Sequence, residues 1–290
     1  MNPQDFDFLK DFLKKRSGIV ISTDKLYLVE SRLTPVARDL GLGSIDDLIG
    51  QLKKSADEAL RTRVVDAMTT NESFFFRDNT PFDTLRDTVL PQIVAARKAK
   101  GQNRIRIWSA ACSSGQEPYT IAMLLEENKA KFGDLKYEIV ATDLSTEIVR
   151  KAKEGKYSQF EVQRGLPITL LIKYFAQVGE QWQISDTLRN MIRFQTFNLL
   201  DSYGGLGKFD VIYCRNVLIY FDQETKASIL NRMADIIAPD GALYLGGAES
   251  VIGISSNFRP VPGLRGVYQT QTGGAGTVSA ATPAVAAGGA

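Results

Sequence analysis

After Lys100, short apolar runs that suit buried β-strands alternate with longer runs of helical periodicity. The strand candidates are RIRIWS, YEIVATD, FDVIYC and ALYLGG, and the helix candidates are Glu117–Asn128, Thr146–Glu154 and Gln223–Ile237. This alternation is typical of a doubly wound parallel sheet, because each crossover between parallel strands needs a connecting helix. We therefore predict an α/β, Rossmann-like domain over residues 101–271.

Three other parts of the chain do not show this alternation of strand and helix candidates. Residues 1–70 carry apolar positions at helical spacing in FDFLKDFLKK, Ile45–Leu52 and Ala59–Met68, which predicts a small all-helical domain followed by a linker over 71–100. Between about 156 and 197, WQIS and MIRFQTF follow a helix candidate near Ile168–Phe175, which predicts a small inserted antiparallel β subdomain. The Ala- and Gly-rich residues 272–290 are predicted to be a disordered tail.

Composition excludes several classes of function. With 44% hydrophobic and 23% charged residues and no apolar run near the roughly 18 residues of a membrane span, we expect a soluble protein without membrane insertion. Its N-terminus carries acidic residues, unlike a secretory signal, so we expect it in the cytoplasm, and we take it to be a monomer. The 35 basic and 33 acidic residues are mixed along the chain, which does not favour nucleic acid as a partner. No histidine and two cysteines leave neither a histidine triad nor an ordinary zinc site. The chemistry must need little proton transfer.

The segment WSAACSSGQEPYT, residues 108–120, runs from a predicted strand through small residues into a helix. Small side chains let a ligand approach the backbone, and the start of a helix offers free N–H groups. Gly115 is its only glycine, so the dinucleotide pattern G-x-G-x-x-G is poorly matched and a nucleoside without phosphates fits better. A plain strand-to-helix turn is the alternative.

Polar residues follow the next strands as well. Asp143 closes EIVATD, where a Rossmann-like fold places an acid that accepts the ribose hydroxyls, although the gap from Gly115 exceeds the usual 20 or so residues. Asn198 and Leu199 precede a glycine-containing loop, and Arg215 and Asn216 close the strand after it. Loops at the carboxyl ends of parallel strands converge on one crevice. The alternatives are an exposed aspartate, a helix cap for Asn216 and a surface charge for Arg215.

The segment TTNESFFFRD, residues 69–78, joins the two predicted domains. It indicates a hinge packed on a cleft, with Asn71, Ser73 and Arg77 facing a ligand. A guanidinium can hold a carboxylate through two parallel hydrogen bonds, which favours Arg77 as a substrate clamp. A buried linker with a solvated arginine is the alternative.

The chain resembles the chemotaxis receptor methyltransferase (CheR) family in six segments taken in order: TTNESFFFR, WSAACSSGQEPYT, ATD, NLL, CRNVLIYF and PDGALYLGGAES. The resemblance runs from about residue 5 to 271. It implies a class I methyltransferase domain that binds S-adenosyl-L-methionine and carries the β subdomain. It also implies transfer of methyl groups to glutamate side chains on the cytoplasmic helices of methyl-accepting chemotaxis receptors, with S-adenosyl-L-homocysteine as the second product.

The resemblance also implies residue roles. The cofactor contacts would be Asn71, Ser73, Arg77, Glu117, Asp143, Asn198, Leu199, Arg215 and Asn216, and the groups that orient the reaction would be Arg77 and Tyr220. Gln116 stands where the family usually has an acid, and Ser73 stands where it also has threonine. A glutamate carboxylate is already a nucleophile at neutral pH, so the reaction agrees with a chain that lacks histidine.

Two questions stay open on the sequence. The acceptor could be another molecule, or the protein could be a sensor that binds S-adenosylmethionine without catalysis. Some members of the family hold a receptor's C-terminal peptide with the β subdomain. Here the turn AQVGEQ between Phe175 and Trp182 is short, which favours docking without a peptide, through Lys10, Lys14, Lys15 and Arg16.

Overall fold

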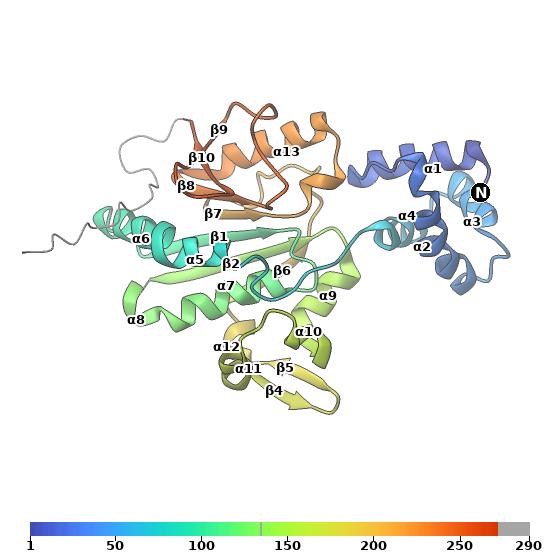
Figure 1. Ribbon diagram of the computed structural model, residues 1–290. Helices are drawn as coiled ribbons and strands as arrows, with labels where there is room; N and C mark the ends of the chain where they lie inside the picture. Colours follow the sequence, from blue (N-terminus) through green and yellow to red (C-terminus); the bar gives the residue numbers. More distant parts are fainter. Residues whose placement is uncertain (134, 272–290) are drawn as a thin grey trace, which may run out of the picture.

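The computed structural model describes residues 1–133 and 135–271 and shows a central sheet between a helical domain and a small second sheet (Figure 1). The helical domain contains α1 (Pro3–Ser17), η1 (Thr23–Lys25), α2 (Leu26–Asp39), α3 (Ile45–Lys54) and α4 (Glu58–Met68). Side-chain caps fix three of the starts, since Asn2 accepts from the backbone N–H of Asp5, Ser44 from that of Asp47 and Asp57 from that of Ala59. The predicted all-helical domain is confirmed.

The central sheet has seven strands in the order β6-β2-β1-β7-β8-β10-β9. Its strands are β1 (Arg104–Ala110), β2 (Lys136–Asp143), β6 (Ile192–Thr196), β7 (Phe209–Cys214), β8 (Ile237–Leu245), β9 (Phe258–Pro260) and β10 (Val267–Thr270). The first five run parallel to one another, and β10 and β9 add antiparallel pairs at the β8 edge. The predicted Rossmann-like sheet is confirmed, and all four strand candidates lie in it.

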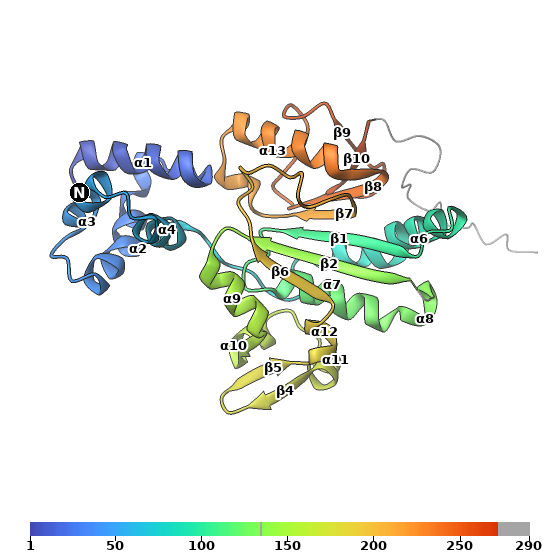
Figure 2. The ribbon, with the colours of Figure 1, turned by 180° about the vertical axis from the view of Figure 1, so that it is seen from behind.

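Helices cover both faces of this sheet (Figures 1 and 2). They are α5 (Thr80–Thr84), the π-helical turn η2 (Leu85–Val89), α6 (Leu90–Ala99), α7 (Gln116–Glu127), α8 (Lys129–Phe132), α9 (Thr146–Glu154) and α13 (Gln223–Ile236). Alternate strand residues serve opposite faces: Ile107 and Tyr213 pack with α5 to α8, whereas Trp108 and Ile212 pack with α13. The carboxyl ends of the parallel strands are thereby fixed at the edge that faces the helical domain.

The small second sheet contains β3 (Lys156–Ser158), β4 (Phe175–Val178) and β5 (Gln181–Ile184), in the antiparallel order β3-β5-β4. Three short helices accompany it: α10 (Gln159–Gln163), α11 (Ile168–Tyr174) and α12 (Asp186–Arg189). The prediction that MIRFQTF belongs to this insertion is wrong, because Ile192–Thr196 forms β6 and pairs in parallel with β2. AQVGEQ is mostly strand, with only Gly179 and Glu180 between β4 and β5.

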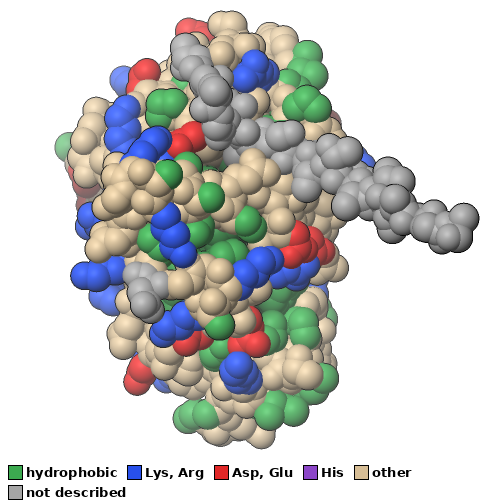
Figure 3. Space-filling view, turned by 90° about the vertical axis from the view of Figure 1, so that its left-hand side faces the viewer, with side chains coloured by type: hydrophobic (Ala, Val, Ile, Leu, Met, Phe, Trp, Pro, Cys, Tyr) green, Lys and Arg blue, Asp and Glu red, His purple; other side chains and the backbone are tan. Residues whose placement is uncertain are grey.

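Lys and Arg side chains are mixed with Asp and Glu over the face shown in Figure 3. Ion pairs such as Arg86–Asp83, Lys131–Asp87 and Arg150–Glu154 show the same mixing. No helix within residues 1–133 and 135–271 is both long and apolar enough to cross a membrane. The predicted tail, 272–290, lies outside the described residues.

Candidate active site

A cleft of about 950 Å³, partly open to solvent, lies where the carboxyl ends of β1, β2 and β7 face the helical domain. All ten residues predicted for the site line it, although they come from distant segments: Asn71, Ser73, Arg77, Glu117, Asp143, Asn198, Leu199, Arg215, Asn216 and Tyr220. Because β2, β1 and β7 are neighbours in the sheet, the loops at their carboxyl ends meet at one cleft, as predicted.

The loop after β1 forms the floor of the cleft in a strained conformation. Ala111 and Ser113 have φ angles of 63° and 51°, which non-glycine residues rarely adopt. The backbone N–H of Ser113 donates to the Asp143 carboxylate at 2.8 Å, and its hydroxyl donates to the Asn71 carbonyl at 2.7 Å. Backbone strain of this kind gathers at ligand sites. Ser113 thus joins the loop to β2 and to the interdomain linker.

Asp143 lies at the end of β2 with 7% of its surface exposed. Its carboxylate also accepts from the backbone N–H of Ser145 at 3.2 Å. Burial raises the pKa of Asp143, and the backbone N–H groups of Ser113 and Ser145 act in the opposite direction. Each carboxylate oxygen keeps a lone pair for a further donor.

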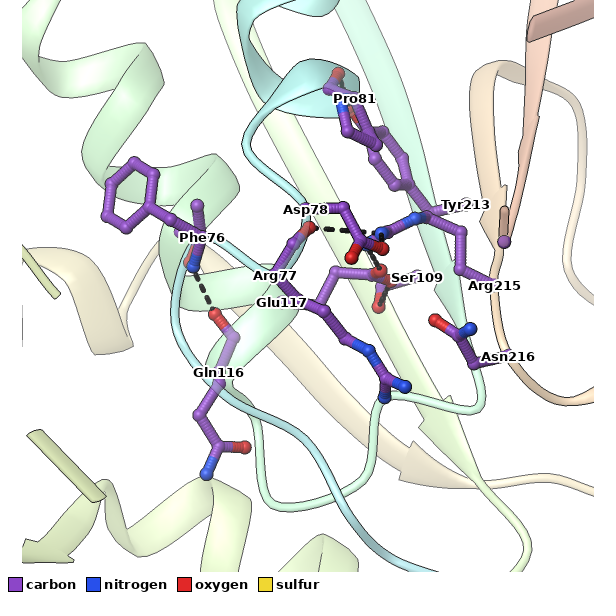
Figure 4. Close-up of polar contacts among 12 residues, drawn as sticks. Phe76, Arg77, Asp78, Pro81, Ser109, Gln116, Glu117, Tyr213, Arg215 and Asn216 are labelled. Carbon is purple, nitrogen blue, oxygen red and sulfur yellow. Dashed lines mark hydrogen bonds and ion pairs between the residues drawn. The ribbon is translucent and has the colours of Figure 1, made fainter. Parts of the chain in front are cut away.

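Arg215 organises the centre of the site (Figure 4). It reaches between two carboxylates, donating to Glu117 at 3.1 Å and to Asp78 at 2.7 Å, and it also donates to the Arg77 carbonyl at 3.0 Å. Its Nε is buried without a hydrogen-bond partner among the described residues. Glu117 in turn accepts from the Ser109 hydroxyl at 2.8 Å, and burial raises its pKa despite the neighbouring guanidinium. A polar ligand could accept a hydrogen bond from the Arg215 Nε and donate one to the Glu117 carboxylate.

Arg77 lies at the linker side of the cleft. Its guanidinium donates to the Glu72 carbonyl at 3.1 Å and lies over the Phe74 ring, 5.5 Å from the centroid. No carboxylate forms an ion pair with it in the described part of the chain. Arg77 is therefore positioned by its neighbours while its charge faces a cleft that can hold an anion.

The end of α1 closes the cleft from the helical domain. The side chain of Asn198 donates to the Arg16 carbonyl at 2.7 Å, and the backbone N–H of Val20 donates to the Tyr220 carbonyl at 2.9 Å. Lys14 forms an ion pair with Asp222 at 2.7 Å. These contacts tie the helical domain to the two loops that carry Asn198 and Tyr220, so the cleft depends on both domains.

Sequence reasoning assigned no role to Asp78, Ser113 or Glu249, which hold site residues in place. Ser113 lies in WSAACSSGQEPYT and Glu249 in PDGALYLGGAES. The pattern of neither segment indicates which of its side chains contact the site residues. Asp78 has a φ of 69°, and its pairing with Arg215 joins residues 137 positions apart. Such a pair has no signal in a single sequence.

Cys112 lies just after β1 and Cys214 ends β7, next in sequence to the cleft residues Ser113 and Arg215. Both are buried, and burial raises the pKa of each thiol well above its ordinary value. A protonated thiol is a poor nucleophile and resists oxidation.

Asp66 lies on α4 where the helical domain meets the start of α9. One carboxyl oxygen is buried without a hydrogen-bond partner among the described residues. Burial raises its pKa from 3.8 to about 6, with the Asp143 and Glu147 carboxylates adding to the effect. A carboxyl with a raised folded-state pKa stabilises the fold below its ordinary pKa and loses that contribution as the pH rises through the folded value.

Replacing Asp66 with asparagine, which mimics the protonated carboxyl, should therefore stabilise the protein by about 1 to 2 kcal/mol at about pH 8 and by less at about pH 4.5. Urea unfolding at the two pH values measures the difference. Asp11→Asn, an exposed change in the same domain, is the control and should show no such growth of stability with pH. Equal gains for Asp66→Asn at both pH values would contradict the assignment.

Two family models match successive parts of this chain. The CheR methyltransferase all-alpha domain matches residues 4–69, and the CheR methyltransferase SAM binding domain matches residues 71–267. The chain belongs to the CheR methyltransferase family. The resemblance inferred from the six segments is confirmed, and the cleft described above lies in the part matched by the S-adenosylmethionine-binding domain.

Relatives in this family align over nearly their whole length. The chemotaxis protein methyltransferase Cher2 of Pseudomonas putida is 42% identical, with 92% of this chain and 98% of the relative covered. Chemotaxis protein methyltransferase 1 of Pseudomonas aeruginosa is 43% identical, covering 90% and 96%. The chemotaxis protein methyltransferase of Vibrio parahaemolyticus is 40% identical, covering 91% and 96%. The protein is a methyltransferase, and its cofactor is S-adenosylmethionine.

The lining of the CheR-family cleft fits this cofactor. Asp143 brings a buried carboxylate to the cleft, and Leu144, Phe197 and Leu199 line it with apolar surface. Glu117 and Arg215 bring opposite charges to it, which suits a ligand with both an ammonium and a carboxylate group.

Proposed function

We propose that this protein transfers methyl groups from S-adenosylmethionine to glutamate side-chain carboxylates of chemotaxis receptors in the cytoplasm. The products are glutamate methyl esters and S-adenosylhomocysteine. The observation that carries the proposal is the position of Arg77, a guanidinium without an ion-pair partner among the described residues, in the same cleft as Asp143. A cationic group beside a nucleoside site favours an acidic acceptor.

The cofactor contacts divide by chemistry. We assign Asp143 to the ribose hydroxyls, and Asn198 and Leu199 to the base. Glu117, Arg215 and Asn216 belong to the amino-acid part, where Glu117 has lone pairs left beside those that Ser109 and Arg215 use. Asn71 and Ser73 complete the linker side of the cleft.

The remaining groups need only to orient the acceptor. S-adenosylmethionine supplies a methyl group already activated on a positively charged sulfur. A glutamate carboxylate, with an ordinary pKa of about 4.3, is ionised at neutral pH, so no general base is required. Arg77 holds one side of the carboxylate and Tyr220 lines the cleft opposite the linker. Orientation and exclusion of water are the means by which this site lowers the barrier.

A second hollow supports an approach path for the acceptor. It meets the cleft at Arg77, Arg215 and Asn216 and continues past Gly247 and the exposed Arg265. Its walls carry three arginines and Asp78, which pairs with Arg215. An acidic side chain entering there would therefore meet the charges of Arg77 and Arg265 before it reaches the cofactor site.

Incubation with labelled S-adenosylmethionine and membranes that contain candidate receptors tests the proposal. The expected result is base-labile label on a receptor band, since methyl esters hydrolyse in base. Heat-denatured protein is the control. Label that resists base, or label confined to other molecules, would contradict the glutamate acceptor.

Receptor docking is proposed to occur through the helical domain by a monomer, without a peptide tether. The hairpin β4–β5 has a turn of only two residues, Gly179 and Glu180, which supports this proposal. Of the four basic residues proposed for docking, Lys14 pairs with Asp222, Lys10 with Asp7 and Arg16 with Glu58. Exposed pairs of this kind are weak enough to exchange for acidic groups on a receptor helix.

Peptides copied from the C-termini of the receptors should therefore fail to bind. Isothermal titration of the protein with each peptide measures this. Micromolar affinity for any of them would overturn tether-independent docking, and would point to strand addition at the small sheet.

A further inference from the structure

Glu249 lies in the turn that follows β8, with 9% of its surface exposed. Five backbone N–H groups donate to its carboxylate. Oε1 accepts from Val217 at 2.9 Å, Leu218 at 2.7 Å and Ile219 at 3.3 Å. Oε2 accepts from Asn216 and Gly246, each at 2.7 Å.

No lysine or arginine in the described residues forms an ion pair with Glu249. A buried carboxylate without a cation is stable only where hydrogen-bond donors replace the lost water. Here the donors are four consecutive N–H groups of one loop, residues 216–219, and one more from residue 246. Successive N–H groups that converge in this way form an anion-binding nest, and the side chain of Glu249 occupies it.

The loop that forms the nest also carries the site. Arg215 lies directly before it and Tyr220 directly after, and both line the cleft together with Asn216. Asn216 has a φ of 58°, a strained value for a residue other than glycine. The carboxylate compensates this strain by accepting from the N–H of Asn216 itself.

Gly246 shows how closely the two strand ends approach. A Cβ atom at this position would lie 2.7 Å from the Glu249 Oε2 and 2.7 Å from the Asn216 Nδ2. Real Cβ atoms do not approach other atoms so closely, so a side chain here would push the loop and the carboxylate apart. The adjacent Gly247 has nothing within 4 Å of an added Cβ.

We propose that Glu249 is a positioning residue that fixes loop 216–219 and thereby places Arg215, Asn216 and Tyr220 in the cleft. It does not line the cleft and acts through these three residues. The expected change in cofactor affinity depends on the cofactor site alone. Any change in methyl transfer that acts through Tyr220 rests on the proposed function.

Glu249→Gln tests the inference. The new amide group presents donors to the N–H groups around it, and a single carbonyl oxygen cannot accept from all five. We expect the affinity for S-adenosylhomocysteine, measured by calorimetry, to fall by about tenfold or more, as for loss of hydrogen bonds to a charged acceptor. Unchanged affinity in a folded Glu249→Gln protein would overturn the inference.

Asp210→Asn is the matched control. Asp210 is equally buried and accepts from the backbone N–H of Arg106 and from Arg97, but it lies at the opposite end of β7. Both variants should unfold at lower temperature, while only Glu249→Gln should lose affinity for S-adenosylhomocysteine. Equal losses of affinity would mean that Glu249 acts only through global stability.

Gly246→Ala and Gly247→Ala provide a second test that leaves the carboxylate in place. Gly246→Ala should weaken S-adenosylhomocysteine binding by about tenfold or more, and Gly247→Ala should leave it unchanged. Equal affinities for the two would overturn the inference. Because none of these measurements uses an acceptor, a wild-type protein that binds S-adenosylhomocysteine but fails to methylate receptors would instead contradict the proposed function.

Discussion

Replacing Arg77 with alanine should slow methyl transfer by about 100- to 1000-fold while leaving the protein folded. The guanidinium is held by the Glu72 carbonyl and the Phe74 ring, yet no carboxylate of the described chain neutralises it. Its loss removes a preorganised cation from the cleft and little packing. Initial rates with labelled S-adenosylmethionine and receptor membranes measure the effect, and thermal unfolding monitored by circular dichroism reports the fold.

Arg164→Ala is the matched control for Arg77. Arg164 lies over the same Phe74 ring, 4.4 Å from its centroid, and pairs with the Glu72 side chain at 2.8 Å, but it does not line the cleft. We expect its rate to stay near that of the wild type. Arg77→Lys should recover only part of the activity, because an ammonium cannot hold a carboxylate through two parallel bonds. A near-normal rate for Arg77→Ala would reassign this residue to packing.

The sheet was predictable because its central strands are buried on both faces. Runs such as FDVIYC, in which every residue is buried in β7, have a composition typical of a parallel core strand. The edge strand β6 was misassigned because it is not buried on both faces. Ile192–Thr196 is partly exposed, so its sequence alternates like that of an antiparallel strand, and only its pairing with β2 reveals where it belongs.

The site was predictable where chemistry follows the ends of strands, as for Asp143 and Arg215. The supporting contacts were not, because they depend on backbone conformation and on pairs distant in sequence. Nothing in the letters of CRNVLIYF indicates that Asn216 adopts a φ of 58° or that the N–H groups of residues 216–219 converge on one carboxylate. Likewise, the contact between Asn198 and the Arg16 carbonyl joins residues 182 positions apart.

Asp143→Ala should weaken S-adenosylhomocysteine binding by about 3 kcal/mol, or roughly 100-fold in Kd, because the ribose hydroxyls lose a charged acceptor. Asp143 also has a structural role that its position in the sequence does not indicate. The same carboxylate accepts from the backbone N–H groups of Ser113 and Ser145, so alanine also leaves two donors without a partner. Asp143→Asn keeps one acceptor oxygen and should retain more of the fold's stability. Calorimetry gives the affinities, and thermal unfolding gives the stabilities.

Ser145→Ala separates the two effects. The Ser145 side chain caps α9 by accepting from the backbone N–H of Ile148 at 3.3 Å, and its loss should cost about 1 kcal/mol of stability. It removes only the Ser145 hydroxyl and leaves the backbone N–H that donates to the Asp143 carboxylate. If the carboxylate itself binds the ribose, Ser145→Ala should keep wild-type affinity for S-adenosylhomocysteine while Asp143→Asn loses it. If both variants lose affinity in parallel with stability, Asp143 acts by holding the β1 and β2 loops, and the ribose contact would have to be assigned to another group in the cleft.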